Sequence, residues 1–417
     1  MLTMVLATLV TAMALMAAAA LVALVKGYFE LRRNLQTASD EFGNILLKTP
    51  TVPGVSVITA ATDASPASRA LVRRLLNLHY GNHEVVLVLD GLTAPELQTW
   101  IADLRLVPQD RGWPLRVPAA DVVGAYVSLD PVKLMVVHKG SRGRADAFNA
   151  GINAAQYPVI GLIDDEADFI PELLLRLIRP MLEAWDRTVA VCGVAPPPAA
   201  PGLVSGIATL ENLRIWLARC AAGAATDHLL PTPGACLLVK RDAVIQVGGF
   251  RAGPIELFLD LHGASASRKL AWRFALVASP VSYRPAATTW GTLVRQTSAD
   301  QRAIGAALGA YPTGPAGHFI GLYGDRALRP LLETAAFGAA FAGWYAGSVP
   351  TALALLVPVI SVGGGMITSM AATVLREFTQ PGATAPVRLA TLFLTSVPEN
   401  LGYRQLRSLH LVARYFV

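Results

Sequence analysis

Charged residues are scarce in this chain, and their scarcity excludes the composition of an ordinary soluble protein. They make up 15% of the 417 residues, whereas hydrophobic residues make up 53%. A soluble globular protein has about 25% charged residues. The mean hydropathy of +0.46 agrees with this deficit. Together these values predict segments that enter a membrane, in a chain that is also long enough for a sizeable folded core.

Cysteine is scarce as well. The three cysteines, Cys192, Cys220 and Cys236, fit no metal-binding spacing. A reduced, cytoplasmic domain needs no disulfide bonds. We therefore interpret the three residues as parts of the hydrophobic core.

The chain also lacks the pattern of a nucleic-acid-binding protein. Its net charge is +6, but basic and aromatic residues do not gather in one stripe. The basic side chains lie near the apolar segments and at Arg404, Arg407 and Arg414. An anionic inner membrane leaflet explains this distribution better, so we expect the membrane, and no nucleic acid, as a partner.

Residues 1–26 are predicted to form an N-terminal transmembrane helix. The run Leu2–Val25 carries no charge and is long enough to cross a hydrocarbon core of about 30 Å. Lys26 and two arginines follow the run, whereas a secretory signal carries its positive charge before it. We favour a retained anchor over a cleaved signal. Because positive charge stays on the cytoplasmic side, the following domain is expected inside, at a bacterial-type inner membrane.

A second membrane region is predicted at residues 330–374, as a transmembrane helical hairpin. Its two apolar runs, Pro330–Ser348 and Pro350–Val374, are separated by a break at Gly347. Small residues in both runs permit close helix contact. The alternative is a pair of buried core helices. Residues 27–50 are predicted as an amphipathic linker, and residues 385–417 as an interfacial, amphipathic tail.

Residues 51–325 are predicted to form a cytoplasmic α/β domain. Buried strands are expected at 55–59, 84–89, 132–137, 159–163 and 234–239, and helices at 68–78, 94–104, 146–155 and 211–220. Strands that alternate with helices imply a mostly parallel sheet with both faces covered. In such sheets ligands bind beyond the carboxyl ends of the strands, where Asp63, Asp90 and Asp164 are expected.

Two motifs in this domain point to a phosphate ligand and a metal. The run K-G-S-R-G-R-A-D-A-F-N from Lys139 to Asn149 combines glycines with Lys139 and Arg144, which suits a phosphate. Asp146 opens a helix in this run, where it can also act as a simple cap. Asp164 and Glu166 alternate after an apolar strand, so they can share one cation with a diphosphate. The alternative for Asp164 and Glu166 is an acidic turn exposed to solvent. The alternative for Asp90-Gly91 is an ordinary turn after a strand.

These segments resemble membrane-embedded, inverting family 2 glycosyltransferases with the GT-A fold, such as cellulose, hyaluronan and poly-N-acetylglucosamine synthases. The resemblance covers roughly residues 50–310. Its motifs are V-S-V-I-T-A-A-T-D, E-V-V-L-V-L-D-G, K-G-S-R-G-R-A-D-A-F-N-A-G, L-I-D-D-E-A-D-F-I-P and P-G-A-C-L-L-V-K-R-D-A-V-I-Q-V-G-G-F.

The resemblance implies a GT-A, Rossmann-like domain that binds a UDP-sugar donor with Mg²⁺ or Mn²⁺. The metal ligands would be Asp164 and Glu166. The acceptor would be a lipid or a polysaccharide. The implied donor-binding residues are Asp63, Asp90, Lys139, Arg144, Asp146 and Asp164.

The chain departs from the family pattern at three points. Gly253-Pro254 stands where the family carries a Glu-Asp pair with the general base, so Glu256 or Asp260 would have to replace it. The family's Q-x-x-R-W stretch reads Q-T-S-A-D here, from Gln296, and Glu166 replaces an aspartate.

A missing general base costs about 10² to 10⁴ in rate. Two hypotheses therefore stand for the function. One is an inverting glycosyltransferase at the inner face of the membrane. The other is a catalytically degenerate binding or scaffold subunit beside another membrane protein or synthase in polysaccharide synthesis or export.

Overall fold

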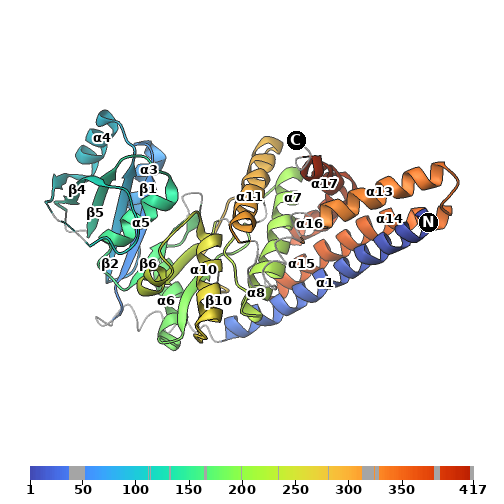
Figure 1. Cartoon of the computed structure of the whole chain (residues 1–417), viewed down its shortest axis with the longest axis horizontal. Coiled ribbons are helices and arrows are strands. Elements are labelled where there is room, and N and C mark those ends of the chain that lie inside the picture. The colour runs from blue at the N-terminus through green and yellow to red at the C-terminus, as the bar shows by residue number, and fades with distance from the viewer. Residues whose placement is uncertain are drawn as a thin grey trace. The chain divides into compact units, whose positions relative to one another are not determined.

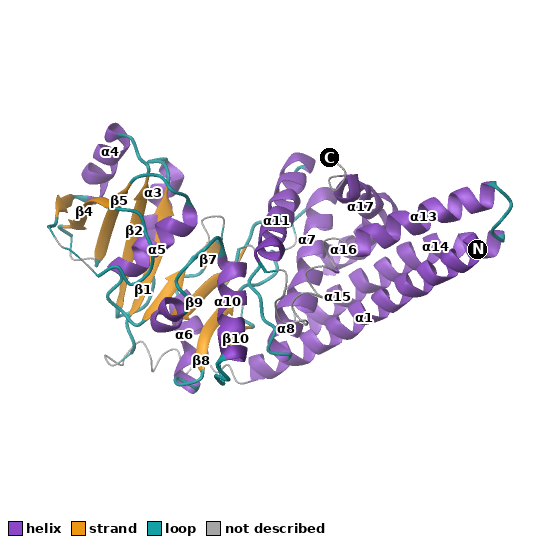
Figure 2. Cartoon of the chain, in the orientation of Figure 1, coloured by secondary structure: helices purple, strands orange, loops and turns teal. Residues whose placement is uncertain are grey.

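The computed structural model describes most of the chain, as two compact units. The residues described are 1–36, 52–110, 112, 114–130, 133–163, 167–198, 200–232, 234–279, 281–311, 324, 328–379 and 386–413. The first unit contains Met1–Arg33, Pro196–His228 and Ala286–Val417, and the second contains Asn34–Ala195 and Leu229–Pro285. Figure 1 shows the course of the chain and Figure 2 the distribution of helices and strands.

The second unit is built on a nine-stranded sheet with the order β10-β8-β9-β6-β1-β2-β5-β4-β3. A two-stranded antiparallel ribbon of β7 and β11 accompanies it. The strands are β1 (Val55–Ala61), β2 (His83–Asp90), β3 (Leu106–Pro108), β4 (Val122–Ser128), β5 (Leu134–Lys139), β6 (Val159–Leu162), β7 (Asp168–Phe169), β8 (Thr188–Gly193), β9 (Cys236–Lys240), β10 (Arg273–Val277) and β11 (Ser282–Tyr283).

Most strands of the large sheet run in one direction. β1 pairs in parallel with β2 and β6, and β2 pairs in parallel with β5. Of the nine strands, β4 and β9 run against the rest. The predicted α/β fold with a mostly parallel sheet is therefore confirmed. The carboxyl ends of β1, β2 and β5 meet at one edge, as they must in a parallel arrangement.

Helices pack on this sheet, and the hydrophobic core lies between the strands and these helices. They are α3 (Pro66–Leu76), α4 (Ala94–Leu104), α5 (Arg144–Ala154), α6 (Leu173–Glu183), α9 (Arg241–Gln246) and α10 (Pro254–Ser267). The main core cluster combines strand residues such as Val57, Leu87 and Val136 with Trp100 of α4 and Leu174 of α6. The three cysteines are buried, as expected for core residues.

The first unit is helical in the part that the structure describes. Its helices are α1 (Leu2–Gln36), α7 (Leu203–Ile215), η1 (Trp216–Ala221), α8 (Ala222–Ala225), α11 (Trp290–Ala310), α13 (Arg329–Tyr345), α14 (Thr351–Pro358), η3 (Val359–Gly363), α15 (Gly364–Thr379), α16 (Pro386–Pro398), η4 (Glu399–Tyr403) and α17 (Arg404–Ala413). A cluster of Leu6, Val10, Ala336, Ala340 and Val357 packs α1 against α13 and α14.

Two helical segments are long and apolar enough to cross a membrane. They are Leu2–Leu35 and Thr351–Thr379, whose most apolar 18-residue windows have mean hydropathies of 2.4 and 1.9. The helix α13 lies at the position of the other predicted hairpin arm and has 17 residues. The predicted linker at 27–50 continues α1 as far as Gln36, and residues 37–50 lie outside the described part of the chain. The C-terminal tail is divided by a kink at Leu401 and Gly402.

The packing of α5 on the sheet generates a testable difference between two helical glycines. A Cβ added at Gly151 of α5 would lie 2.4 Å from Ile58 Cγ2, whereas one added at Gly263 of α10 meets nothing within 4 Å. We expect Gly151→Ala to lower the free energy of unfolding by about 1–3 kcal/mol through overpacking. Gly263→Ala should instead raise it by about 0.5–1 kcal/mol. Denaturant titration of both variants checks this, and equal effects would contradict the packing.

Candidate functional site

A buried lysine between two carboxylates lies at the carboxyl-end edge of the sheet. The parallel pairing of β2 with β5 places Asp90 opposite Lys139 in register, each at the last position of its strand. Lys139 Nζ lies 2.8 Å from Asp90 Oδ1 and 2.6 Å from Asp146 Oδ2, and it donates to Gly140 O at 2.8 Å. The exposed fraction of the lysine side chain is 0%. Three of the predicted donor-site residues are thus brought together.

The turn after β2 fixes the position of Asp90. Gly91 has a φ of 73°, in the left-handed region that favours glycine, and its N–H donates to Lys139 O at 2.9 Å. A Cβ at this position would lie 2.5 Å from Ser141 Cβ. The glycine therefore allows the loops after β2 and β5 to touch. Arg142 N–H also donates to Asp90 Oδ1, at 3.3 Å.

The charges around Lys139 decide its protonation. Burial alone lowers the pKa of a lysine, but the hydrogen bonds and charges of Asp146 and Asp90 outweigh it and raise the pKa of Lys139. The lysine is therefore a cation at neutral pH. Because its pKa is raised in the folded state, its contribution to stability is present below the pKa of an unfolded lysine. It is lost only as the pH rises through the folded-state value.

A basic loop precedes the N-terminus of α5. Gly143 precedes the helix with a φ of 90°, and Arg142 and Arg144 on either side are exposed. Asp146 in the first turn accepts a hydrogen bond from Ala120 N–H at 2.9 Å. The first N–H groups of a helix and its dipole favour an anion, and flanking guanidinium groups add to this. The loop thus has the chemistry of a phosphate site. It lies beside the group of Lys139, Asp90 and Asp146, called the lysine cluster below.

Asn149 of α5 holds the Gly248-Gly249-Phe250 turn. Its Oδ1 accepts from Phe250 N–H at 2.7 Å, and its Nδ2 donates to Phe250 O and to Pro118 O, both at 2.9 Å. Gly249 has a φ of 85°, and a Cβ there would lie 2.6 Å from Asn149 Oδ1. One buried amide therefore ties the helix that follows the basic loop to the turn before α10. The sequence analysis did not identify this role.

Asp63 follows β1 and acts in a local cap. Its Oδ1 accepts from Ser65 N–H at 3.1 Å and from Ser68 Oγ at 2.6 Å. The hydrogen bonds from Ser68 and Ser65 lower the pKa of Asp63, so the carboxyl group is ionised at neutral pH. Its place at the edge where β1 ends agrees with the position expected from the sequence.

The two candidate catalytic acids lie on α10, and each has a structural partner. Glu256 is 4% exposed and accepts from Gly253 N–H at 3.1 Å, which caps the start of α10 from its third position. Asp260 pairs with Arg251 through both carboxylate oxygens, with Arg251 Nε 3.2 Å from Oδ2. In this state both carboxylates are engaged within the protein.

The predicted metal ligands Asp164 and Glu166 lie outside the described residues. Asp168, which the sequence analysis left out, is described. It accepts from Arg74 Nη2 and from Tyr283 Oη, each at 2.7 Å, and the hydrogen bond from Tyr283 lowers its pKa. The order Glu166-Ala167-Asp168, an acid on each side of an alanine, could have indicated Asp168 as a further candidate. Among the described residues, no group of three or more His, Cys, Asp and Glu side chains could hold a metal.

The Q-T-S-A-D segment that begins at Gln296 lies within α11, in the first unit, called the helical unit below. The lysine cluster, the basic loop and α10 belong to the second unit, called the sheet unit.

Comparison with solved structures places the fold among GT-A glycosyltransferases. A mannosyltransferase from Pyrobaculum calidifontis, solved with GDP-Man and Mn²⁺, matches 94% of this chain and 99% of its own, with a TM-score of 0.55 and 18% identity. A glucosyl-3-phosphoglycerate synthase from Mycobacterium tuberculosis, solved with Mn²⁺, UDP and phosphoglyceric acid, matches 63% of this chain and 81% of its own, with a TM-score of 0.36 and 15% identity. No protein-family model and no curated protein sequence matches the chain.

Removal of the Asn149 amide tests the link between α5 and the turn. In Asn149→Ala, two buried backbone groups of Phe250 lose their partner, so we expect the free energy of unfolding to fall by about 2–4 kcal/mol. Asn77→Ala is the matched control, because Asn77 Nδ2 donates to Arg73 O at an exposed position. It should change the stability by less than about 1 kcal/mol. Equal losses in the two variants, measured by denaturant unfolding, would refute the link.

Proposed function

We propose that this protein is a membrane-attached glycosyltransferase that uses a nucleoside-diphosphate sugar, with UDP as the expected nucleotide. The observation that carries the proposal is the Lys139 cluster at the carboxyl ends of β2 and β5, beside the exposed basic loop. Fold alone does not establish an activity. This arrangement adds a specific chemistry to the fold, because it offers carboxylates for a nucleoside next to cations and helix N–H groups for phosphates.

Each part of the donor has a proposed partner. Asp90, with Asp63 at the same edge, would bind the base or ribose, and Lys139 with Asp146 would orient the nucleotide. Arg144 at the start of α5 would contact the diphosphate. Asp164 and Glu166 would hold Mg²⁺ or Mn²⁺, whose ligands in proteins are carboxylates. When bound, the cation would offset the charge that develops on the leaving diphosphate. Asp168 adds a further carboxylate next to this pair in the sequence.

Membrane attachment is supported by the two apolar segments. Only 17% and 22% of the residues in their most apolar windows are buried, whereas the core helix of a soluble protein is mostly buried. Lys26 and Arg33 lie toward the carboxyl end of α1, and positive charge stays on the cytoplasmic side. We therefore propose that the sheet unit lies in the cytoplasm of a cell with a bacterial-type inner membrane. The acceptor would be a lipid or a polysaccharide.

A second candidate function is a binding or scaffold subunit without turnover. The specific observation in its favour is that Glu256 caps its own helix and Asp260 is paired with Arg251. A protein of this kind would bind the nucleotide sugar and dock beside an active synthase or export protein. The two candidates share the donor site and differ only in chemistry, so separate experiments address binding and turnover.

Nucleotide binding is the first test. We expect the purified protein to bind UDP in the presence of Mn²⁺, and GDP belongs in the panel because the mannosyltransferase of similar fold was solved with GDP-Man. One charge-assisted contact is worth about 1.5–3 kcal/mol, so the loss of a single arginine contact corresponds to about 10- to 100-fold in affinity. The double variant Arg142→Gln/Arg144→Gln should weaken binding by at least this much. Arg268→Gln, an exposed position at the end of α10, should leave it unchanged. Calorimetry measures both. A folded protein that binds no nucleotide would overturn the proposal.

Turnover is the second test, read as nucleotide release from a panel of UDP- and GDP-sugars. Wild-type protein should release nucleotide, and Asp164→Asn should abolish the release. Glu256→Gln keeps a capping residue because glutamine also serves at this position. If either acid is the general base, Glu256→Gln or Asp260→Asn lowers the rate by about 10²- to 10⁴-fold. Arg251→Gln also removes the Arg251–Asp260 ion pair but keeps the carboxylate of Asp260. It therefore separates a loss of chemistry from a loss of packing.

Binding without release in wild type would favour the scaffold subunit. Release that persists unchanged in both acid variants would remove Glu256 and Asp260 from consideration as the base.

A further inference from the structure

Exposed apolar side chains divide unevenly between the two units. In the sheet unit, the exposed large hydrophobic residues that the structure describes are Leu115, Val123 and Leu129. All the others described lie in the helical unit, and they include residues of α1, α13, α14, α15, α16 and α17. Soluble monomers rarely expose large contiguous apolar patches. The helical unit therefore has the surface of a protein that meets an apolar environment.

The C-terminal segment 386–413, which contains α16, η4 and α17, is polar inside and apolar outside. Its buried polar residues include Thr395, Ser396, Glu399, Asn400 and Ser408. Its exposed large hydrophobic residues are Leu394, Val397, Leu401, Leu406 and Leu409. A helix on the surface of a soluble protein has the opposite polarity, with its apolar side toward the core. Neither apolar span accounts for this segment.

Exposed ionisable residues of this segment lie only near its two ends, in the part that the structure describes. Arg388 lies in the first turn of α16, and His410 lies in the last turn of α17. The two arginines between them, Arg404 and Arg407, are 16% and 26% exposed and pair with glutamates of α13 and α7. The exposed face between the ends therefore presents no charge to its surroundings.

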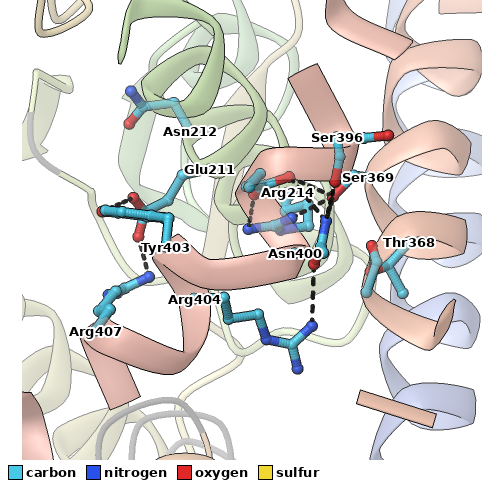
Figure 3. Close-up of polar contacts among 12 residues, drawn as sticks. Glu211, Asn212, Arg214, Thr368, Ser369, Ser396, Asn400, Tyr403, Arg404 and Arg407 are labelled. Carbon is cyan, nitrogen blue, oxygen red and sulfur yellow. Dashed lines mark hydrogen bonds and ion pairs between the residues drawn. The ribbon is translucent and has the colours of Figure 1, made fainter. Parts of the chain in front are cut away.

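The buried polar groups of the segment satisfy one another and their neighbours (Figure 3). Glu399 lies 2.6 Å from Arg214 Nη2 and accepts from Ser369 Oγ at 2.8 Å. Asn400 Nδ2 donates to Glu399 Oε2 at 3.1 Å and to Ser396 O at 2.8 Å. These contacts tie the segment to α7 and α15. Its polar side thus finds partners in the protein rather than in bulk water.

The kink at Leu401 and Gly402 interrupts the helix, but backbone groups beside it stay bonded within the protein. Gly402 N–H donates to Gln405 Oε1 at 2.9 Å, and Gln405 Nε2 donates to Asn400 O at 2.9 Å. One side-chain amide therefore serves both a backbone donor and a backbone acceptor. In hydrocarbon, irregular backbone is tolerated only where the protein satisfies its polar groups. The kink meets this requirement at these two groups.

The packing of α1 against the second apolar span defines levels along both. Thr3 Oγ1 donates to Ser348 O at 3.0 Å, just before that span begins. Further along, a Cβ added at Gly364 would lie 3.4 Å from Ala17 Cβ. The two spans therefore run side by side in the same direction. Ser361, about one helical turn before Gly364, is level with the middle of the uncharged run of α1.

The C-terminal segment contacts the spans at this middle level. Gln405 Nε2 donates to Ser361 Oγ at 3.2 Å. The two carboxylate oxygens of Glu333 accept from Ser361 Oγ and from Ser408 Oγ, the latter at 2.7 Å. Residues on both sides of Leu406 thus reach the level of Ser361. If the spans cross a membrane, the start of α17 lies within its hydrocarbon layer.

We propose that the C-terminal segment is embedded in the hydrocarbon layer beside the two apolar spans, where acyl chains of the bilayer cover its exposed leucines. The inference rests on the membrane attachment proposed above. Acyl chains are favoured over a second copy of the chain, because the exposed apolar residues of the unit lie on six helices and a partner would cover one patch. The buried polar residues lower the hydropathy of the segment, which conceals it from a search for apolar runs.

The test is the accessibility of a nitroxide label on single introduced cysteines, in the full chain reconstituted into phosphatidylcholine vesicles. Oxygen enters hydrocarbon, whereas a polar nickel complex stays in water. The chain offers leucines of matched exposure: Leu401 at 66% and Leu406 at 68%, with Leu15 of α1 and Leu129 of the sheet unit both at 65%. The three native cysteines are buried, so wild type treated with the label gives the background.

Labels at Leu401→Cys and Leu406→Cys should resemble the label at Leu15→Cys. Their ratio of oxygen to nickel collision rates should exceed that of Leu129→Cys by about 10-fold or more, because the nickel complex must leave water to reach them. If one of the two C-terminal variants does not fold, the other decides the question. Val25→Cys marks the end of the uncharged run of α1. Labels at both C-terminal positions that match Val25→Cys would put the segment on the membrane surface and refute its embedding.

The control positions separate a failure of this inference from a failure of membrane attachment. If the label at Leu15→Cys is as accessible to nickel as that at Leu129→Cys, the premise is lost and the inference fails with it. If Leu15→Cys lies in lipid while both C-terminal labels meet nickel, only the inference is refuted. If neither reagent reaches the C-terminal labels, a second copy or another protein covers this face, which overturns the assignment to acyl chains.

Discussion

The sheet unit depends on the burial of one ammonium group between two carboxylates. An isolated buried charge costs several kcal/mol, and removal of one partner from a buried ion pair typically costs about 3–5 kcal/mol. Lys139 therefore constrains three elements at once, because Asp90 ends β2, Lys139 ends β5 and Asp146 lies in the first turn of α5. The edge of the sheet has little freedom to rearrange without exposing or unpairing a charge. A ligand at this edge would meet groups that are already oriented.

Glycines allow this arrangement, and the same device recurs in the helical unit. Gly91 lets the loops after β2 and β5 touch, and Gly249 lets Asn149 reach the turn before α10. Gly365 leaves the space that Asn400 and Arg404 occupy. In each case a polar side chain approaches backbone at a distance that a Cβ would prevent. The sites in this protein are thus defined by missing side chains as much as by the charged residues beside them.

Local periodicity predicted the central elements well. The helix over residues 94–104 matches α4, and the buried strands at 55–59, 84–89 and 159–163 fall within β1, β2 and β6 or at their ends. The sequence analysis did not assign β8 or β10, although both are apolar runs, of six and five residues. Their place in the sheet depends on the pairing of β10 with β8 and of β8 with β9. Strand pairs formed between residues far apart in sequence leave little local signal.

For the candidate site as well, the sequence predicted several residues but not the contacts between them. Asp90, Lys139 and Asp146 were identified as site residues because they end strands or follow a glycine-rich loop, but their ion pairing depends on the register of β2 and β5. The role of Asn149 depends on Phe250, which is 101 positions away. The partner of Glu256 was available from sequence, since Gly253-Pro254 followed by Glu256 is the pattern of a helix start with a glutamate at its third position.

The engagement of Glu256 and Asp260 does not by itself exclude catalysis, as the magnitudes indicate. Arg251 is 56% exposed, and ion pairs with an exposed partner contribute about 0–1 kcal/mol. Release of Glu256 gives up one hydrogen bond to a charged group, which is worth about 1.5–3 kcal/mol. A general base lowers a barrier by about 3–5 kcal/mol, the equivalent of 10² to 10⁴ in rate. Either acid would therefore repay its release if an acceptor hydroxyl came within hydrogen-bonding distance. The choice between enzyme and scaffold depends on where the acceptor binds rather than on the contacts that these acids make without it.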